Sequence, residues 1–288
     1  MIIICGSESQ GEIKLMPTLY VVATPIGNLE DISLRALRIL REVKLIAAED
    51  TRKTKRLLNN YDIRTTMTSY YEHNKMIKLD YILDVLRQDD VAIVSEAGTP
   101  GISDPGYELI KAAQDRYIPV VPVPGASAIV TALSVSGLPT DRFTYLGFLP
   151  RKAGDRKKLL SSVKNDPGTL IVLEAPHRLI AAMKNILETL GDRKIAVCRE
   201  LTKMYEEVFK GTISDAISHF TEPRGEFTLV IEGDTEKAEP QITEDIEGQL
   251  HNMRESGLSA QEAISKISKE TGLSRKVLYR VWLKKKPI

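Results

Sequence analysis

Residues 18–50 read TLYVVATPIGNLEDISLRALRILREVKLIAAED and contain the unit on which the rest of the chain is built. Residues 18–26 are rich in β-branched and aromatic side chains and are bounded by a proline and a glycine, which predicts a strand and a turn. Residues 33–43 carry leucines at helical spacing, and residues 45–48 are apolar again. A strand, a helix and a second strand in this order predict an α/β layer with a largely parallel sheet.

The same alternation continues toward the C-terminus. The pattern predicts helices at 51–60 and 74–87 and strands at 91–95 and 118–123. A second block begins near Ala126, with a helix at 178–190, and its expected strands are 143–148, 169–174, 194–199 and 227–232. Because the last strands are closely spaced, we expect the second sheet to be mixed.

Two of the expected helices show a readable apolar face. In the helix at 74–87 we expect the core face to consist of Ile77, Tyr81, Ile82 and Val85. In the helix at 178–190 we expect it to consist of Ile180, Met183, Ile186 and Leu187, with Gly191 as the C-terminal cap. Cys198 falls inside an expected strand, so we do not expect a catalytic thiol.

The composition is that of a globular protein without a disulfide framework or a metal site. The chain has 288 residues, 42% hydrophobic and 27% charged, and its net charge is +1. Two cysteines far apart in the sequence fit a reducing cytosol, and four histidines at no ligand spacing do not indicate zinc. We find no run approaching the ~18 apolar residues of a membrane helix. We therefore expect a cytoplasmic protein.

We expect four regions along the chain. They are a loose extension at 1–16, α/β domains at 17–125 and 126–236, and a linker with a helical domain at 237–288. The helical region should contain helices at 259–269 and 274–283, joined at Gly272, with Ser274 as N-cap. Its expected core consists of Ile264, Ile267, Leu273, Leu278 and Val281. This helix-turn-helix spacing and a local balance of +7 over residues 266–288 favour either nucleic-acid contact or a small bundle that mediates dimer contacts.

Six loops that follow expected strands combine glycine, proline and charged residues. They are 24–31, 49–52, 95–106, 123–128, 174–178 and 199–203. In open α/β sheets, ligands bind outside the carboxyl ends of the strands. The loop at 95–106, SEAGTPGISDPG, is too rich in glycine for a simple turn and indicates a ligand approached closely by backbone. The chain lacks the glycine fingerprint of dinucleotide-binding folds, the phosphate-binding loop and the serine-hydrolase elbow.

Several of these charged residues have a structural alternative. Asp50 follows a strand and precedes a helix, so it fits either a polar ligand site or a helix N-cap. Residues 151–164 carry a balance of +5, which fits either a phosphate contact or a solvated helix face. His177 and Arg178 lie beside Glu174 and could serve in acid–base chemistry or phosphate binding. We expect His73, His219 and His251 to be surface or structural residues.

Eight motifs in this order resemble one known family. They are ATPIGNLEDI at 23–32, AEDTR at 48–52, SEAGTPGISDPG at 95–106, VPVPGASA at 121–128, GFLPRK at 147–152, EAPHR at 174–178, RELTK at 199–203 and GEFTLVIEG at 225–233. The chain resembles the 16S rRNA cytidine 2′-O-methyltransferases of the tetrapyrrole methylase superfamily, over about residues 17–288. The resemblance implies two α/β domains with S-adenosylmethionine in the cleft between them, a small C-terminal helical domain and a homodimer. It also implies a cytidine ribose in the decoding region of 16S rRNA as the substrate, on the assembled small subunit.

The resemblance also assigns site residues. Cofactor contacts are expected at Pro25, Gly27, Ala97, Gly98, Thr99, Ile102, Ser103, Ser127 and Ala128, with Glu226 to Thr228 as adenosine contacts. Catalytic roles are expected for Glu49, Asp50, Arg52 and Glu200. RNA contacts are expected at Lys152, Arg156, Lys157, His177 and Arg178. The chain departs from the family pattern at Glu96, where aspartate is usual, and at Tyr71 and Tyr205, where histidine is frequent.

The expected reaction is in-line methyl transfer to a ribose 2′-hydroxyl, with Glu49, Asp50 or Glu200 as the base. The sequence does not choose among these three carboxylates. A tetrapyrrole-precursor methylase is an alternative, although a small substrate needs neither the basic run nor the helical tail. A helix-turn-helix regulator is a second alternative, although it would leave some 225 residues unexplained.

Overall fold

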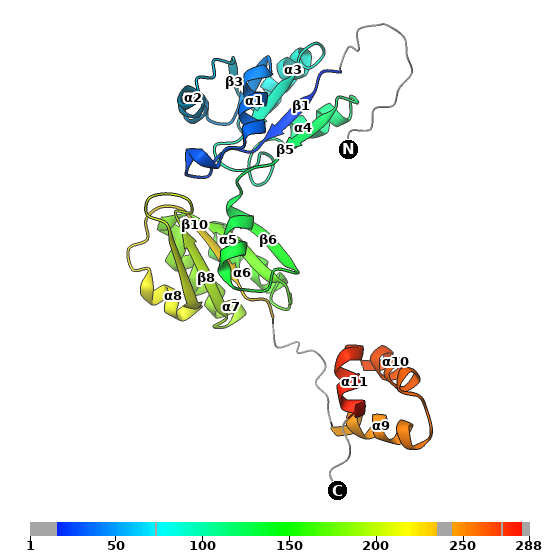
Figure 1. Ribbon diagram of the computed structural model, residues 1–288. Helices are drawn as coiled ribbons and strands as arrows, with labels where there is room; N and C mark the ends of the chain where they lie inside the picture. The colour runs from blue at the N-terminus through cyan, green and yellow to red at the C-terminus, as the bar shows by residue number, and fades with distance from the viewer. Residues whose placement is uncertain (1–15, 73, 235–243, 272, 284–288) are drawn as a thin grey trace, which may run out of the picture.

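The computed structural model describes residues 16–72, 74–234, 244–271 and 273–283 (Figure 1). Two five-stranded sheets follow one another along the chain, and a group of helices comes last. Figure 1 shows the two sheets joined by the segment between β5 and α5, with the C-terminal helices set apart from both. The N-terminal extension, the linker at 235–243 and the turn at Gly272 lie outside the described residues, as does His73.

The first sheet is entirely parallel. Its strands are β1 (Leu19–Val22), β2 (Leu45–Ala48), β3 (Met67–Ser69), β4 (Val91–Val94) and β5 (Val120–Val123), in the order β3-β2-β4-β1-β5. The connecting helices are η1 (Leu29–Asp31), α1 (Leu34–Glu42), α2 (Thr51–Asn60), α3 (Lys75–Val85) and α4 (Tyr107–Gln114). Every residue of β2 and β4 is buried, as expected for inner strands covered on both faces. The predicted parallel sheet is therefore confirmed.

The second sheet is mixed, as predicted. Its strands are β6 (Phe143–Phe148), β7 (Thr169–Glu174), β8 (Lys194–Arg199), β9 (Glu207–Thr212) and β10 (Phe227–Ile231), in the order β6-β7-β10-β8-β9. Only β6 and β7 run parallel; the other pairs are antiparallel. Its helices are α5 (Ala128–Ser136), α6 (Ala153–Ser162), η2 (Pro176–Arg178), α7 (Leu179–Leu190) and α8 (Ile213–His219).

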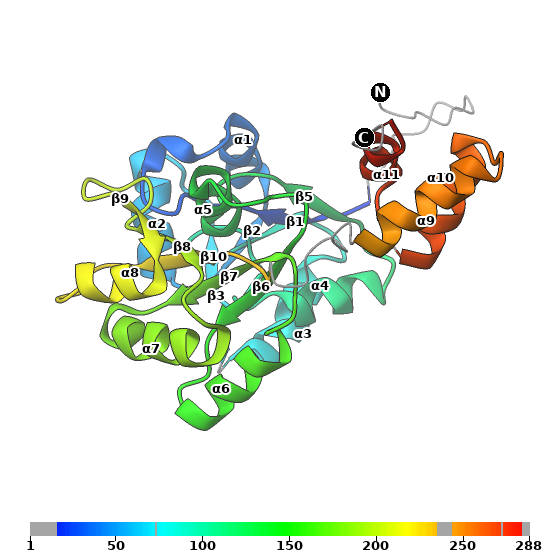
Figure 2. The ribbon, with the colours of Figure 1, turned by 90° about the horizontal axis from the view of Figure 1, so that it is seen from below.

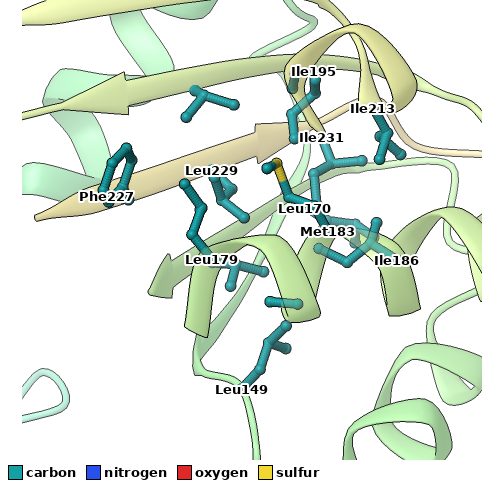
Figure 3. Close-up of a cluster of buried hydrophobic side chains, with 14 of the residues drawn as sticks. Leu149, Leu170, Leu179, Met183, Ile186, Ile195, Ile213, Phe227, Leu229 and Ile231 are labelled. Atoms are coloured by element: carbon teal, nitrogen blue, oxygen red, sulfur yellow. The ribbon is translucent and has the colours of Figure 1, made fainter. Parts of the chain in front are cut away.

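Helices cover both faces of the second sheet. The view from below shows α6, α7 and α8 side by side along one face (Figure 2). Leu179, Met183 and Ile186 of α7 point into the core against Leu170 and Leu229 (Figure 3). On the opposite face, α5 packs against β8 and β10 through a smaller cluster that includes Cys198. Burial raises the pKa of the Cys198 thiol to about 11, so the reactive thiolate is disfavoured at neutral pH.

The predicted face of α3 is correct for two of its four residues. Ile82 is buried and Val85 packs against the core cluster of the first sheet, as predicted, whereas Ile77 is 79% and Tyr81 is 48% exposed. Leu79 also packs against the core cluster of the first sheet. The helix carries two apolar stripes, and residue spacing alone cannot tell which of them faces the sheet. In α7 the predicted phase is correct, since Met183 and Ile186 are buried, and Gly191 is the C-cap.

Three C-terminal helices form their own small core. They are α9 (Glu244–Glu255), α10 (Ala260–Thr271) and α11 (Arg275–Leu283). All five residues predicted for this core are buried in one cluster. The Ser274 hydroxyl accepts a hydrogen bond from the Val277 N–H at 3.3 Å, which confirms the predicted N-cap. No helix in the described part of the chain is long and apolar enough to cross a membrane.

Candidate active site

Three of the predicted loops meet at the carboxyl ends of β4, β1 and β5. The N–H of Thr24 donates to the Gly98 carbonyl at 2.9 Å, and the N–H of Gly98 donates to the Thr24 carbonyl at 3.0 Å. The N–H of Ala23 donates to the Val123 carbonyl at 3.1 Å, which ties the first loop to the end of β5. The adjacency of these strands in the parallel sheet therefore places the loops in one group.

Asp50 is a helix N-cap, which is the structural one of its two predicted roles. Its carboxylate accepts hydrogen bonds from the N–H groups of Arg52 at 2.8 Å and Lys53 at 3.3 Å, so it caps α2. The bond from the Arg52 N–H is the main cause of its lowered pKa. The Arg52 side chain itself is 89% exposed, with its Nε 3.6 Å from Asp50. Arg52 therefore reaches toward solvent from the start of α2.

Glu49 and Asp104 form a pair of half-buried carboxylates. Glu49 accepts a hydrogen bond from the N–H of Glu96 at 2.9 Å. Burial raises the pKa of Glu49, the neighbouring charge of Asp50 raises it further, and Lys53 opposes this. Burial and the charge of Glu49 together raise the pKa of Asp104 to about 6, although a hydrogen bond from Ser95 lowers it. Two carboxylates with raised pKa values in one loop group are a recognised sign of acid–base chemistry.

Loops of the second sheet reach the first loop. The N–H of Asn28 donates to the Thr202 hydroxyl at 3.0 Å. A Cβ on Gly27 would overlap the side chain of Lys203, so only glycine permits this close approach. Glu200 accepts hydrogen bonds from Lys203 and from the N–H of Glu226, both at 2.9 Å. Burial alone would raise the pKa of Glu200, but these bonds outweigh it and lower that pKa below the ordinary value.

A cavity of about 450 Å³ lies where these loops converge. Among its lining residues are Thr24, Pro25, Gly27, Lys53, Ser95, Glu96, Ala97, Lys203 and Glu226. Lys53 forms an ion pair with Glu96, and Lys203 forms one with Glu226 at 2.9 Å. We call this space the first cavity. It brings together predicted cofactor contacts from the first and second α/β units.

The other predicted cofactor contacts lie around the same loops. Thr99 and Ile102 belong to the loop at 95–106, and Ile102 is 50% exposed. The Ser103 hydroxyl is hydrogen-bonded to the Tyr145 hydroxyl of β6 at 2.7 Å, a second link between the two units. Ser127 is the N-cap residue of α5, and Ala128 is the first residue of that helix.

The predicted RNA contacts divide into exposed and buried residues. Lys152 and His177 are exposed, and Lys157 is exposed and paired with Glu188 at 2.7 Å. Arg156 is only 6% exposed, and its guanidinium donates to Asn185 at 2.7 Å and to the Pro150 carbonyl at 3.3 Å. Arg156 therefore serves the fold rather than a surface that RNA can reach.

Arg178 is also drawn inward. Its Nε lies 3.3 Å from the buried carboxylate of Glu174, and its guanidinium donates to the Leu149 carbonyl. Burial raises the pKa of Glu174, and the N–H of Ala175 and the charge of Arg178 oppose this. These bonds fix the segment from β6 to α6 on the end of β7.

Sequence reasoning did not single out four residues of this site. They are Lys53, Asp104, Tyr145 and Lys203. Asp104 had a usable signal, since it is one of two acids in the glycine-rich loop. Lys53 had none, because its partner Glu96 lies 43 residues away in the sequence. Lys203 lies in the predicted loop at 199–203, but its partner Glu226 is 23 residues away.

The chain is similar to known proteins over most of its length. Residues 18–217 match the family model for tetrapyrrole (corrin/porphyrin) methylases. A ribosomal RNA small subunit methyltransferase I from Halalkalibacterium halodurans is 46% identical, over 92% of this chain and 94% of that protein. The protein of the same name from Bacillus subtilis is 44% identical, over 92% of this chain and 93% of that protein. A third, from Thermotoga maritima, is 48% identical, and 99% of it corresponds to 76% of this chain.

Solved structures share the fold. A uroporphyrin-III C-methyl transferase from Thermus thermophilus, complexed with S-adenyl homocysteine, matches with a TM-score of 0.53 and 20% identity, over 76% of this chain and 99% of that one. A diphthine synthase matches with a TM-score of 0.59 and 13% identity, over 75% and 90%. These likenesses confirm the predicted fold class. The chain therefore belongs to the tetrapyrrole methylase family, in the group that contains the ribosomal RNA small subunit methyltransferase I proteins.

Proposed function

We propose that this protein transfers a methyl group from S-adenosylmethionine to the 2′-hydroxyl of a cytidine ribose in 16S rRNA. The observation that carries the proposal is the 41–46% identity, over 92–93% of the chain, to relatives named ribosomal RNA small subunit methyltransferase I. The assembled small subunit, acted on in the cytoplasm, is the proposed form of the substrate. The exposed basic residues beside β6 and η2 support an RNA substrate over a small corrinoid, which would need no such surface.

The residues of the first cavity fit the cofactor. Its volume of about 450 Å³ lies within the usual range of ~300–1,000 Å³ for small-molecule sites. Lys53 and Lys203 would attract the carboxylate of the amino-acid end, and Glu96 and Glu226 would attract its ammonium group and the sulfonium. The backbone around Gly98, together with Pro25 and Gly27, would enclose the remainder. When bound, the cofactor supplies an electrophilic methyl group on sulfur.

The chain's own residues must align the ribose and accept its proton. A ribose hydroxyl is a weak nucleophile at neutral pH, and a positioned base contributes ~10²–10⁴-fold. Hydrogen bonds lower the pKa of Asp50 and of Glu200, whereas burial raises the pKa of Glu49 although Glu49 accepts one N–H. We therefore assign the proton-accepting role to Glu49, with Asp104 beside it. The exposed guanidinium of Arg52 would orient a phosphate of the RNA near this pair.

We also propose a homodimer. Met76, Ile77 and Tyr81 of α3 are 65%, 79% and 48% exposed, which is unusual for apolar residues on one helix. A second copy of the chain would remove this surface from water. Analytical ultracentrifugation of the full chain and of Ile77→Asp tests this, because the charge should shift the protein to a monomer. A monomeric wild type would refute the proposal.

The experiment that tests the activity is transfer of radiolabelled methyl groups to small ribosomal subunits from a strain lacking the modification. The RNA is then digested and the labelled nucleoside identified. We expect the label on the 2′-oxygen of a cytidine. Label on a base would overturn the acceptor but not the cofactor. If neither subunits nor free rRNA became labelled while cofactor binding was intact, the RNA substrate would be refuted.

A further inference from the structure

A second cavity of about 420 Å³ lies beside the first. It is lined by Arg199, Glu200, Tyr205, Arg224 and Gly225. These residues come from the end of β8, the loop between β8 and β9, and the segment that enters β10. Figure 1 shows this loop at the edge of the second sheet that faces the first domain. None of the five has a part in the proposed transfer reaction.

One ion-paired wall separates the two cavities. Glu200 lines the second cavity, and its partners Lys203 and Glu226 line the first. Lys203 donates to the carboxylates of Glu200 and Glu226, both at 2.9 Å, so these two hydrogen bonds connect the lining of the first cavity with that of the second. A molecule in the second cavity would therefore lie next to whatever occupies the first.

The backbone around the second cavity is held in a fixed shape. Gly225 has φ +89°, and a Cβ there would overlap the Glu200 side chain, so the two walls meet only because this residue is glycine. Arg199 donates from Nε to the Arg224 carbonyl at 2.8 Å and from Nη1 to Glu207 at 3.2 Å. These bonds fix the position from which the Arg224 side chain extends.

Two side chains of this cavity face solvent. Tyr205 is 71% exposed. The Arg224 guanidinium lies 3.4 Å from Glu222, and both side chains of this pair are about 80% exposed. Such surface ion pairs are weak and are easily replaced by a phosphate. An exposed aromatic ring beside an available guanidinium is the combination by which proteins hold unpaired nucleotides.

We infer that the second cavity binds a nucleotide of the RNA substrate next to the methylated one, with its base stacked on Tyr205 and its phosphate against Arg224. This inference rests on the proposed function, since it needs an RNA strand that passes the first cavity. Stacking requires only an aromatic face and tolerates different bases, so the subsite orders the strand rather than reading its sequence. An unpaired segment of RNA is the form that can enter it.

The test compares steady-state methyl transfer to small subunits by wild type, Tyr205→Ala, Tyr205→Phe and Arg224→Ala. The matched control is Tyr117→Ala, an 88% exposed tyrosine before β5, at the opposite end of the first sheet from the loops. We expect Tyr205→Ala to raise KM for subunits about 5-fold or more, since stacking of one base contributes at least about that much affinity. Tyr205→Phe should retain wild-type KM. Arg224→Ala should raise KM and reduce its dependence on salt.

Cofactor affinity, measured calorimetrically with S-adenosylmethionine alone, should be equal in all five proteins. The inference is overturned if Tyr205→Ala keeps the wild-type KM or if Tyr117→Ala raises KM by the same factor. It is also overturned if Tyr205→Phe raises KM as much as Tyr205→Ala does. A loss of cofactor affinity in Tyr205→Ala would also overturn it, because the loop would then act through the first cavity. If the wild type labelled no RNA at all, the proposed function itself would be at fault.

Discussion

Replacing Asp104 by asparagine should stabilise the fold at neutral pH while it slows methyl transfer. Burial and the nearby charge of Glu49 raise the pKa of Asp104 from its ordinary value of 3.8 to about 6. Each pKa unit corresponds to ~1.4 kcal/mol, so the whole shift of roughly two units corresponds to ~3 kcal/mol. Because the side chain is only partly buried, solvent screening reduces the contribution to about 1–2 kcal/mol.

The stability of the wild type changes with pH because the folded and unfolded states bind the Asp104 proton with different affinity. Between about pH 4 and pH 6 the folded protein holds the Asp104 proton more firmly than the unfolded chain does. The wild type therefore has this stabilisation in full below about pH 4 and loses it as the pH rises through about 6. Asparagine is neutral at every pH, so the variant loses no stability from this position as the pH rises. The variant should thus match the wild type at about pH 4 and exceed it by about 1–2 kcal/mol at about pH 8.

Thermal and urea unfolding of wild type, Asp104→Asn and the exposed control Asp141→Asn, at both pH values, measures this difference. A gain of 1 kcal/mol should raise Tm by about 2–4 °C in a unit of this size. A variant less stable than wild type at the higher pH, or a gain that is the same at both pH values, would refute the electrostatic reasoning. If Asp104→Asn turned over at the wild-type rate, the proposed role of Asp104 in assisting the proton acceptor Glu49 would be refuted.

The remaining predictions concern the base, the basic run and the C-terminal helices. Glu49→Gln should lower kcat by ~10²–10⁴-fold with cofactor affinity unchanged; unchanged turnover would exclude Glu49 as the base. Arg156→Ala should lower the free energy of unfolding by about 1–3 kcal/mol, measured in urea, because it removes a buried side chain and leaves its two half-buried partners without their donor. Lys152→Ala should leave stability unchanged and reduce the salt dependence of RNA binding, by a slope of about 0.7. A chain ending at Asp234 should keep cofactor affinity, because α9–α11 have a core of their own, and should methylate subunits more slowly; full-rate methylation would show the helices to be dispensable.

Local pattern was sufficient for the inner strands and for the edge strands β5 and β6, and insufficient for the edge strands β3 and β9. The strand at 91–94 is apolar throughout because both its faces are covered, so its sequence shows it clearly. Strands β3 and β9 were not predicted, and both lie at a sheet edge. Strand β9 is only partly buried and carries polar residues such as Lys210, so it lacks a clear apolar signal.

The loops of the site could be predicted, but the roles of their residues could not. Glycine, proline and acidic residues after strands marked the loops at 24–31 and 95–106, because such loops must approach a ligand with their backbone. Arg156 and Lys157 are neighbours in one basic run, yet one is buried and the other exposed. Which of two neighbours turns inward depends on Asn185, a partner 29 residues away from Arg156, and no local pattern contains that information.

The carboxylates of the site fall into two kinds according to their contacts. Asp50 and Glu200 accept hydrogen bonds from N–H groups or a lysine, which lower their pKa values and keep them charged while they hold the loops together. For Glu49 and Asp104, burial and like charge outweigh the opposing contacts and raise the pKa. A general base must gain a proton during the reaction, so a carboxylate whose charge is poorly stabilised is better suited than one that is already neutralised. We therefore expect the same acidic residue type to serve positioning at one strand end and proton transfer beside it. The difference lies in the burial of the pair and in the number of donors around each group.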